Sequence, residues 1–292
     1  MTSSSSNARH LLIIGGGNMA QALMGGLIQA KAPSQVQTLT VIEPLEATRK
    51  TLGNLQIQAQ SRGIVFNLYE NLQAASRAND IDWVLLAVKP QQVAEVFDQL
   101  PDGLRSLLCG PGSQAHWLSI AAGLGCDKLR AWIGHDQLVR AMPNTPALIQ
   151  EGITGLYASP TLTPLARQQA ESLMAAVGQV VWVADESLMN AITALSGSGP
   201  AYVFRFAEAL AAAGQSMGLG PEQALALARQ TIKGAALLMS SSPDHPSLLR
   251  ERVTSKGGTT AAALASLEAD GFEQVIQKAL RAARDRGEEM GR

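Results

Sequence analysis

Short apolar runs recur along the first 184 positions of the chain, separated by polar or mixed segments. Six of these runs predict strands, at residues 10–14, 38–42, 63–66, 82–88, 117–121 and 138–142. The run at 82–88 is almost continuously apolar, which is typical of a parallel strand buried on both faces. Two more runs, at 155–158 and 179–183, predict strands at the edge of the sheet. Helical character at 18–30 follows the first strand directly, and this alternation predicts an α/β fold with a doubly wound sheet.

The pattern changes after residue 185, where the strand signals stop. Helices are predicted over residues 187–195, 201–217, 221–240, 259–269 and 272–290. We therefore place a boundary near 184–186, between an α/β domain over 1–184 and an all-helical domain over 185–292. These helices are rich in Ala on several faces, which indicates packing on more than one side and hence self-association. A compact bundle within one chain is the alternative interpretation.

Composition and charge exclude several classes of protein. A length of 292 residues suffices for two domains, and aromatic residues at 4% argue against an all-β fold. A net charge of −1 gives no general attraction to nucleic acid, and no apolar run is long enough to span a bilayer. The Ser-rich start lacks the apolar stretch of a signal peptide, so we expect a frayed tail on a cytoplasmic protein.

Cysteine and histidine usage points away from a metal site. Cys109 and Cys126 have no metal-ligand spacing, and the four histidines are scattered along the chain. Reduced thiols are favoured over a disulfide in a chain without an export signal. Around Cys109, the stretch 104–116 contains Cys-Gly-Pro-Gly-Ser and predicts a surface loop.

A glycine-rich segment that fits G-x-G-x-x-A follows the first predicted strand and opens the first predicted helix. This pattern predicts dinucleotide binding. A dinucleotide site needs one glycine for the tight turn, a second for the approach of the pyrophosphate, and a small residue for close helix–strand packing. The start of the helix would direct free N–H groups at the phosphates. A purely structural turn is the alternative. The predicted cofactor-binding residues are Gly15, Gly16, Gly17, Asn18, Met19 and Ala20.

Glu43 ends the second predicted strand. An acid at that place usually accepts hydrogen bonds from the adenosine ribose, which favours NADH. Arg49 is close in sequence and would offset the repulsion of a 2′-phosphate, so NADPH and NADH both stay open. A solvated strand end is the alternative role for Glu43.

Five further segments occur in the order of a known motif set. They are 87–91 (Ala-Val-Lys-Pro-Gln), 119–123 (Ser-Ile-Ala-Ala-Gly), 142–146 (Met-Pro-Asn-Thr-Pro), 195–202 (Leu-Ser-Gly-Ser-Gly-Pro-Ala-Tyr) and 253–260 (Val-Thr-Ser-Lys-Gly-Gly-Thr-Thr). With the glycine loop, they resemble the motifs of the pyrroline-5-carboxylate reductase family from about residue 11 to residue 290. The Ser-Gly-Ser-Gly-Pro and Gly-Gly-Thr-Thr stretches are the most specific.

The resemblance implies a Rossmann-like dinucleotide-binding domain and a helical domain that binds substrate and pairs with a second subunit. It implies reduction of the C=N bond of 1-pyrroline-5-carboxylate to L-proline by NADPH or NADH, in a dimer or a higher oligomer of dimers. Thr259 and Thr260 match substrate positions. The positions that the resemblance places along the cofactor are Asn71, Val88, Lys89, Pro90, Ala121 and Asn144.

Three features depart from the family pattern. Position 256 is Lys where many members carry Pro, which leaves open how that loop is stiffened. Position 43 is Glu where many carry a neutral residue, which puts a preference for NADPH in doubt. The stretch 104–116 also looks longer than in the family.

The proposed substrate is a cyclic imine with a carboxylate, so the site must hold an anion. Gly257 and Gly258 permit unusual backbone angles that expose successive N–H groups, and a helix start after them favours an anion. The Thr260 hydroxyl is the predicted catalytic group and proton relay, beside Thr259 as a further substrate contact. Capping of the helix by Thr259 or Ser255 is the alternative.

Ser196 and Lys89 are two further residues of types that take part in catalysis. Ser196 lies in the Ser-Gly-Ser-Gly-Pro stretch and is predicted to contact substrate, but no nucleophile elbow with a matching acid and His is present. Close helix packing is an equal explanation for that stretch. Lys89 follows an apolar strand, and we favour a backbone that borders the nicotinamide over a catalytic lysine.

Three other interpretations of the function remain open. A dehydrogenase for β-hydroxy acids needs an acid/base lysine in a core helix, and Lys233 is available although the accompanying motif is absent. A nucleotide-sensing module without catalysis needs the glycine loop but not residues 257–260. A structural oligomer with a relic site is a third, weaker alternative.

Overall fold

A computed structural model describes residues 9–30 and 36–291, so the predicted frayed start at residues 1–8 lies outside the described residues. The chain divides into two compact units. Unit 1 runs up to Gly197 and includes the residues from Ala283 onward, and unit 2 is Ser198–Ala282. The change from mixed to helical structure comes close to the predicted boundary at 184–186. By their contacts, however, residues 186–197 belong to unit 1 with the sheet.

Unit 1 is built on an eight-stranded sheet in the order β3-β2-β1-β4-β5-β6-β7-β8. The strands are β1 His10–Ile14, β2 Thr38–Ile42, β3 Val65–Tyr69, β4 Trp83–Leu86, β5 His116–Ser119, β6 Leu138–Met142, β7 Gly152–Ala158 and β8 Gly178–Trp182. They pair in parallel except for β7, which is antiparallel to β6. The order of the first six strands reverses between β1 and β4, which confirms the doubly wound Rossmann-like fold.

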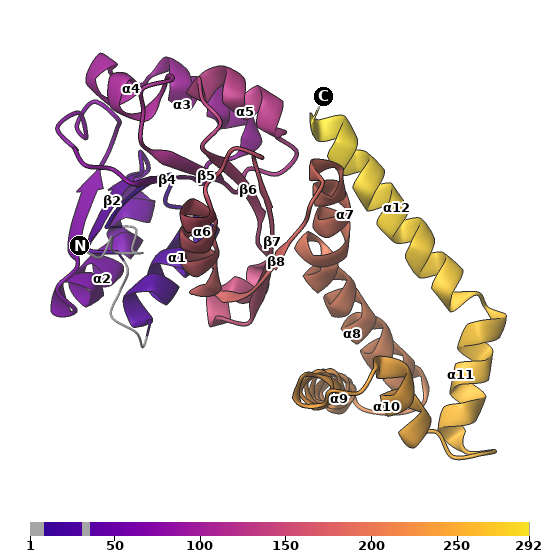
Figure 1. Cartoon of the computed structure of the whole chain (residues 1–292). Coiled ribbons are helices and arrows are strands. Elements are labelled where there is room, and N and C mark those ends of the chain that lie inside the picture. Colours follow the sequence, from indigo (N-terminus) through magenta and orange to yellow (C-terminus); the bar gives the residue numbers. More distant parts are fainter. Residues whose placement is uncertain (1–8, 31–35, 292) are drawn as a thin grey trace. The chain divides into compact units, whose positions relative to one another are not determined.

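Alternate residues of the central strands are buried on opposite faces of the sheet. In β1, Leu11 and Ile13 pack in one apolar cluster while Leu12 and Ile14 pack in the other. This explains why these strands are apolar throughout and do not alternate with polar residues. Figure 1 shows the two helical layers that cover the faces. They are α1 Asn18–Gln29, α2 Glu46–Ser61 and α6 Pro164–Ala175 on one side, and α3 Val93–Asp98, α4 Asp102–Leu108 and α5 Cys126–Ile133 on the other.

Three predictions within unit 1 need correction. The strand predicted at 63–66 begins later, as β3, because Gly63 has a left-handed φ of 75° in the turn after α2. The strand predicted at the edge over 155–158 is β7, which lies between β6 and β8. The loop predicted over 104–116 begins as α4, because Leu104 and Leu108 are four residues apart and both are buried.

The second half of the chain is helical, as predicted. The helix expected over 187–195 is instead three short pieces, the 3-10 turn η3 (Glu186–Leu188), α7 (Met189–Ile192) and the π-helix η4 (Thr193–Gly197). The long elements are α8 Gly199–Ser216, α9 Pro221–Ser241, α10 Pro246–Arg252, α11 Thr259–Ala269 and α12 Phe272–Gly291. The last turns of α12 belong to unit 1, where Lys128 Nζ donates to the Gly291 carbonyl at 2.7 Å.

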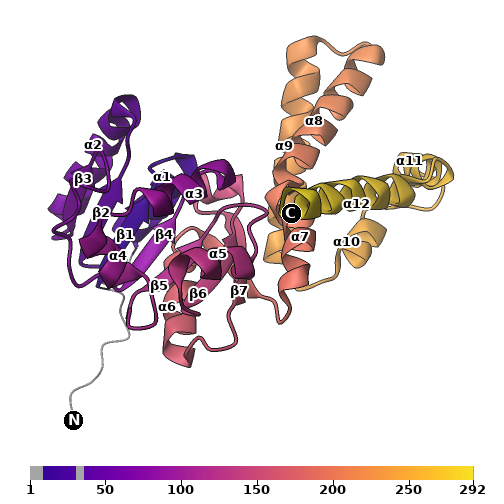
Figure 2. The ribbon, with the colours of Figure 1, turned by 90° about the horizontal axis from the view of Figure 1, so that it is seen from above.

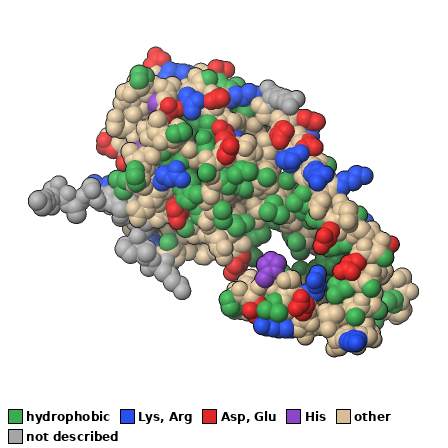
Figure 3. Space-filling view, turned by 45° about the vertical axis from the view of Figure 1, so that its right-hand side comes forward, with side chains coloured by type: hydrophobic (Ala, Val, Ile, Leu, Met, Phe, Trp, Pro, Cys, Tyr) green, Lys and Arg blue, Asp and Glu red, His purple; other side chains and the backbone are tan. Residues whose placement is uncertain are grey.

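Unit 2 buries little of its apolar surface within one chain. Helices α8 and α9 lie side by side (Figure 2). They pack through small residues, with Gly214 against Ala224. Large apolar side chains remain exposed, among them Phe204 at 64% and Leu237 at 60%. Figure 3 shows hydrophobic side chains exposed on the face of the molecule that it draws. An exposed apolar surface of this kind is typical of a protein–protein interface. None of the described helices is long and apolar enough to cross a membrane.

Two adjacent glycines of α1 allow a direct test of how closely this helix packs. A Cβ atom on Gly26 would lie 2.3 Å from the Ala176 carbonyl oxygen, whereas one on Gly25 would meet only the Leu55 side chain at 3.8 Å. We expect Gly26→Ala to lower the free energy of unfolding by about 1–3 kcal/mol through this backbone clash. The matched variant Gly25→Ala should be neutral or raise it by up to about 1 kcal/mol, because alanine favours helix.

Urea unfolding of both variants at one protein concentration measures these changes. Equal effects of the two substitutions would contradict the close packing of α1 against the end of α6.

Candidate functional site

The glycine loop lies where the strand order reverses. Gly15 follows β1 with a left-handed φ of 99°, and a Cβ atom there would lie 2.7 Å from the Ala87 carbonyl oxygen and 3.0 Å from Val88 Cγ1. Only glycine fits this close approach between the ends of β1 and β4. The structure therefore brings together the predicted residues Gly15 and Val88, although they are far apart in the sequence.

The start of α1 has the properties of a phosphate site. Gly17 is the N-cap residue, no side chain caps the helix, and its first turn carries no acidic residue. Gly17 and Asn18 are exposed, and a Cβ atom on Gly17 would meet no atom within 4 Å. Open space in front of uncapped N–H groups is what a pyrophosphate needs. Met19 and the buried Ala20 continue the helix, with Ala20 packed in the core as the motif requires.

Glu43 ties the glycine loop to the end of β2. Its Oε2 accepts the Gly16 N–H at 2.7 Å and its Oε1 accepts the Leu45 N–H at 2.8 Å. Glu43 is buried, so it is not the solvated strand end that formed the alternative. The contact is close, since a Cβ atom on Gly16 would lie 2.9 Å from Leu52 Cδ1 and 3.1 Å from Glu43 Oε2.

A cavity of about 290 Å³ opens beside this loop at the carboxyl ends of β1 and β2. Gly15, Pro44, Asn71 and Val88 line it, so a third predicted residue joins the group. The Asn71 Oδ1 accepts the Ala74 N–H at 2.8 Å, which fixes the turn after β3. The hollow has the position of an adenosine pocket in doubly wound folds.

The other predicted cofactor residues of unit 1 lie on neighbouring elements. Lys89 is exposed and caps the 3-10 turn η1 (Pro90–Gln92), in which Pro90 is the first residue. Ala121 is buried just beyond the end of β5. These positions follow β4 and β5 at the carboxyl edge, where ligands of open α/β sheets bind.

Asn144 and Ser196 are joined by a hydrogen bond that sequence reasoning did not predict. Asn144 Nδ2 donates to the Ser196 carbonyl at 3.2 Å, and its Oδ1 accepts the Ile153 N–H at 2.9 Å. The Ser196 hydroxyl, in the π-helix, donates to the Ile192 carbonyl at the end of α7 at 3.0 Å. A Cβ atom on Gly197 would lie 2.6 Å from Met142 Cε, so close packing explains one glycine of this stretch.

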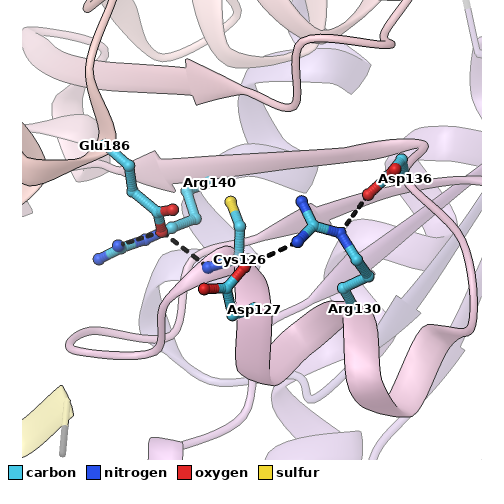
Figure 4. Close-up of polar contacts among 6 residues, drawn as sticks. All are labelled: Cys126, Asp127, Arg130, Asp136, Arg140 and Glu186. Atoms are coloured by element: carbon cyan, nitrogen blue, oxygen red, sulfur yellow. Dashed lines mark hydrogen bonds and ion pairs between the residues drawn. The ribbon is translucent and has the colours of Figure 1, made fainter.

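Glu186, the first residue of η3, anchors the start of the segment between β8 and α8 (Figure 4). Its Oε1 accepts the Cys126 N–H at 2.7 Å and the Arg140 Nη1 at 2.7 Å, and the Arg140 side chain is only 10% exposed. Burial raises the pKa of the Cys126 thiol to about 12, and Glu186 adds to this rise. No motif links these residues, so this cluster could not be predicted from the sequence. A thiol held protonated in this way is a structural group and not a nucleophile.

The Gly-Gly-Thr-Thr stretch forms the start of α11 in unit 2. Gly257 has a left-handed φ of 71°, Gly258 is the N-cap residue, and no side chain caps the helix. The alternative of capping by Thr259 or Ser255 is therefore not what the structure contains. Thr260 is half-buried, and a Cβ atom on Gly257 would meet nothing within 4 Å. The uncapped N–H groups of this eleven-residue helix suit a carboxylate.

Both cysteines are free in the structure, as the sequence favoured. Within residues 9–30 and 36–291, no group of three or more His, Cys, Asp or Glu side chains is arranged to hold a metal ion.

Comparison with known proteins covers both units. Residues 186–290 match the family model "Pyrroline-5-carboxylate reductase dimerisation", and residues 10–108 match "NADP oxidoreductase coenzyme F420-dependent". The chain is 40% identical to a pyrroline-5-carboxylate reductase of Pseudomonas aeruginosa, over 96% of each chain. A solved pyrroline-5-carboxylate reductase from Coxiella burnetii is 36% identical, with a TM-score of 0.83 over 98% of this chain and 100% of that one. A Plasmodium falciparum pyrroline carboxylate reductase, solved with NADP bound, is 27% identical, with a TM-score of 0.76 over 99% and 100%.

Removal of the charge of Glu186 should destabilise the protein. Glu186→Gln keeps an acceptor for the Cys126 N–H but leaves the buried Arg140 guanidinium without its carboxylate. We expect the free energy of unfolding to fall by about 1–3 kcal/mol. The control Glu46→Gln removes the partner of Lys50 in an exposed pair and should cost about 0.5 kcal/mol or less. Chemical denaturation compares the two, and equal losses would contradict a special role for Glu186.

Proposed function

The chain belongs to the pyrroline-5-carboxylate reductase family, and on that premise we propose that it reduces 1-pyrroline-5-carboxylate to L-proline with NADPH or NADH, the last step of proline biosynthesis. The observation that carries the proposal is the extent of the similarity. It covers 96% of the chain and of its relative, so it includes both the glycine loop and the Gly-Gly-Thr-Thr stretch.

The residues of unit 1 fit a dinucleotide. Gly15 and Gly17 let the backbone approach the pyrophosphate, and the uncapped start of α1 offers it N–H groups. Asn71 and Val88 line the cavity proposed for the adenosine half, and Lys89, Pro90, Ala121 and Asn144 follow along the carboxyl edge. A bound reduced nicotinamide supplies a hydride.

Gly257, Gly258, Thr259 and Thr260 are proposed to hold the imine. The N–H groups at the start of α11 would bind its carboxylate, and the Thr260 hydroxyl would hydrogen-bond its ring nitrogen. Reduction adds a hydride to the imine carbon, and the nitrogen carries the added proton. A protonated iminium is already an electrophile, so positioning accounts for much of the rate. Thr260 is our candidate for the proton relay, through a water or directly.

Ser196 and Lys256 have subsidiary proposed roles. The Ser196 hydroxyl donates within its own helix, so it would meet the substrate as an acceptor. Lys256 is exposed next to Gly257 and would add a positive field near the carboxylate. A solvated loop lysine is the equally simple account of Lys256.

We also propose self-association as a dimer or an oligomer of dimers through the helical part. The match to a dimerisation family at residues 186–290 and the exposed apolar side chains of α8 and α9 support this. A cytoplasmic location stays a prediction.

The proposed activity has a direct assay. The purified protein should oxidise NADPH or NADH in the presence of 1-pyrroline-5-carboxylate and form proline, because the family match covers both proposed sites. Loss of nicotinamide absorbance and detection of proline measure the two products. Turnover of a β-hydroxy acid without turnover of the imine would favour a different dehydrogenase. Dinucleotide binding without any oxidation would favour a sensing module.

Thr260→Ala tests the proposed relay. It should lower kcat for the imine by about 10–100-fold, in keeping with a lost hydrogen bond or proton relay at the reacting nitrogen. The half-buried position predicts little change in unfolding free energy. Ser266→Ala removes an exposed hydroxyl from the same helix and is the matched control. Unchanged steady-state turnover of Thr260→Ala would remove this residue from the mechanism.

A further inference from the structure

We propose that Arg49 recognises the 2′-phosphate of NADPH, and that Glu43 acts as a tie for the glycine loop and not as a selector for NADH. The chain would then accept both dinucleotides. This inference rests on the proposed use of a nicotinamide dinucleotide and names the residue that distinguishes its two forms.

The carboxylate of Glu43 is committed to the protein. It is 6% exposed, and each of its oxygens accepts a backbone N–H, one from Gly16 in the glycine loop and one from Leu45 at the end of the β2–α2 connection. An acid that selects NADH directs its charge at the ribose hydroxyls and repels a 2′-phosphate. Here two charge-assisted hydrogen bonds within the protein already use the charge of Glu43. The repulsion between the Glu43 carboxylate and a 2′-phosphate, which the sequence suggests, is thereby weakened.

Arg49 brings a positive charge to the same strand end. It lies in the first turn of α2, and its Nη1 donates to the carbonyl oxygens of Glu43 at 2.9 Å and Pro44 at 2.6 Å. Both acceptors are neutral, and within the described part of the chain no carboxylate is paired with this guanidinium. The two bonds fix the side chain in advance, so less entropy is lost when a ligand binds. The remaining donors of the planar fork suit a phosphate.

The position of Arg49 matches the expected place of the ribose. Pro44, whose carbonyl oxygen it contacts, lines the cavity that also contains Gly15 and Asn71. In dinucleotide-binding folds, an arginine near the acid at the end of the second strand accommodates the 2′-phosphate. Glu43 and Arg49 together place one negative and one positive charge there, which fits acceptance of both cofactors.

Lys50 is the natural control because it follows Arg49 directly. Its Nζ is paired with Glu46 Oε1 at 2.8 Å and is highly exposed. A general loss of positive charge from α2 would therefore be reproduced by Lys50→Ala, whereas loss of a specific phosphate contact would not.

Calorimetric titration of the full chain with NADP⁺ and NAD⁺, without any imine, tests the inference. Arg49→Ala should weaken NADP⁺ binding by about tenfold or more, the effect of a lost charged hydrogen bond, and change NAD⁺ binding by less than about twofold. Lys50→Ala should change neither by more than about twofold. Adenosine 2′,5′-bisphosphate and AMP serve as probes of the adenosine end. Arg49→Ala should weaken binding of the bisphosphate and leave binding of AMP nearly unchanged.

Two further variants keep the test decisive. Arg49→Gln retains amide donors for the two carbonyls but lacks the charge, so it should show the same selective loss of NADP⁺ affinity even if Arg49→Ala folds poorly. Glu43→Gln should weaken both dinucleotides by a similar factor. Equal losses of NADP⁺ and NAD⁺ in the Arg49 variants, or unchanged NADP⁺ binding, would overturn the role of Arg49. A selective gain of NADP⁺ affinity in Glu43→Gln would show that Glu43 is a selector after all.

Binding without turnover of the imine would refute the proposed reaction but leave the role of Arg49 intact. Failure to bind either dinucleotide in the unmodified protein would refute both.

Discussion

The close approach of Gly15 to the backbone of Ala87 sets the arrangement of the carboxyl edge of the sheet. A side chain on residue 15 would collide with the Ala87 carbonyl oxygen, so the ends of β1 and β4 are held together only because this residue is glycine. That contact directs the chain into α1 at Gly17, with its first N–H groups uncapped. Glu43 secures the loop from the next strand. The proposed phosphate site is thus a product of backbone geometry more than of side chains.

A second set of ties holds the segment between β8 and α8. Glu186 binds Arg140 and the first N–H of α5 at one end of this segment, and Asn144 binds the Ser196 carbonyl at the other. The residues between them form a 3-10 turn, a short α-helix and a π-helix. Irregular helices of this kind are often found at functional sites, and here side chains from β6 and the loop after it fix both ends. Ser196 and Gly197, the first two residues of the Ser-Gly-Ser-Gly-Pro stretch, are therefore held by contacts within unit 1.

The sequence predicted the parts of the fold that depend on local pattern. The strands at residues 10–14, 38–42 and 138–142 match to the residue because a buried apolar run has clear limits. The glycine loop was located because its motif joins a strand to a helix. The break in the helix predicted at 187–195 was missed, because the hydrogen bonds that stabilise it come from residues more than 40 positions away. The Arg140–Glu186 pair and the buried role of Glu43 depend on the same kind of distant contact, which no spacing in the sequence reveals.

Unit 1 is discontinuous along the chain, because the last turns of α12 contact it through Lys128 and Gly291. A ribosome releases the sheet and its helices long before it releases those turns. Domains generally fold as they emerge, but this unit gains its final helical contacts only after the whole of unit 2 has been synthesised. The order of translation therefore does not separate the two units into independent folding events. Removal of the last turn of α12 would perturb the structure near the start of α5.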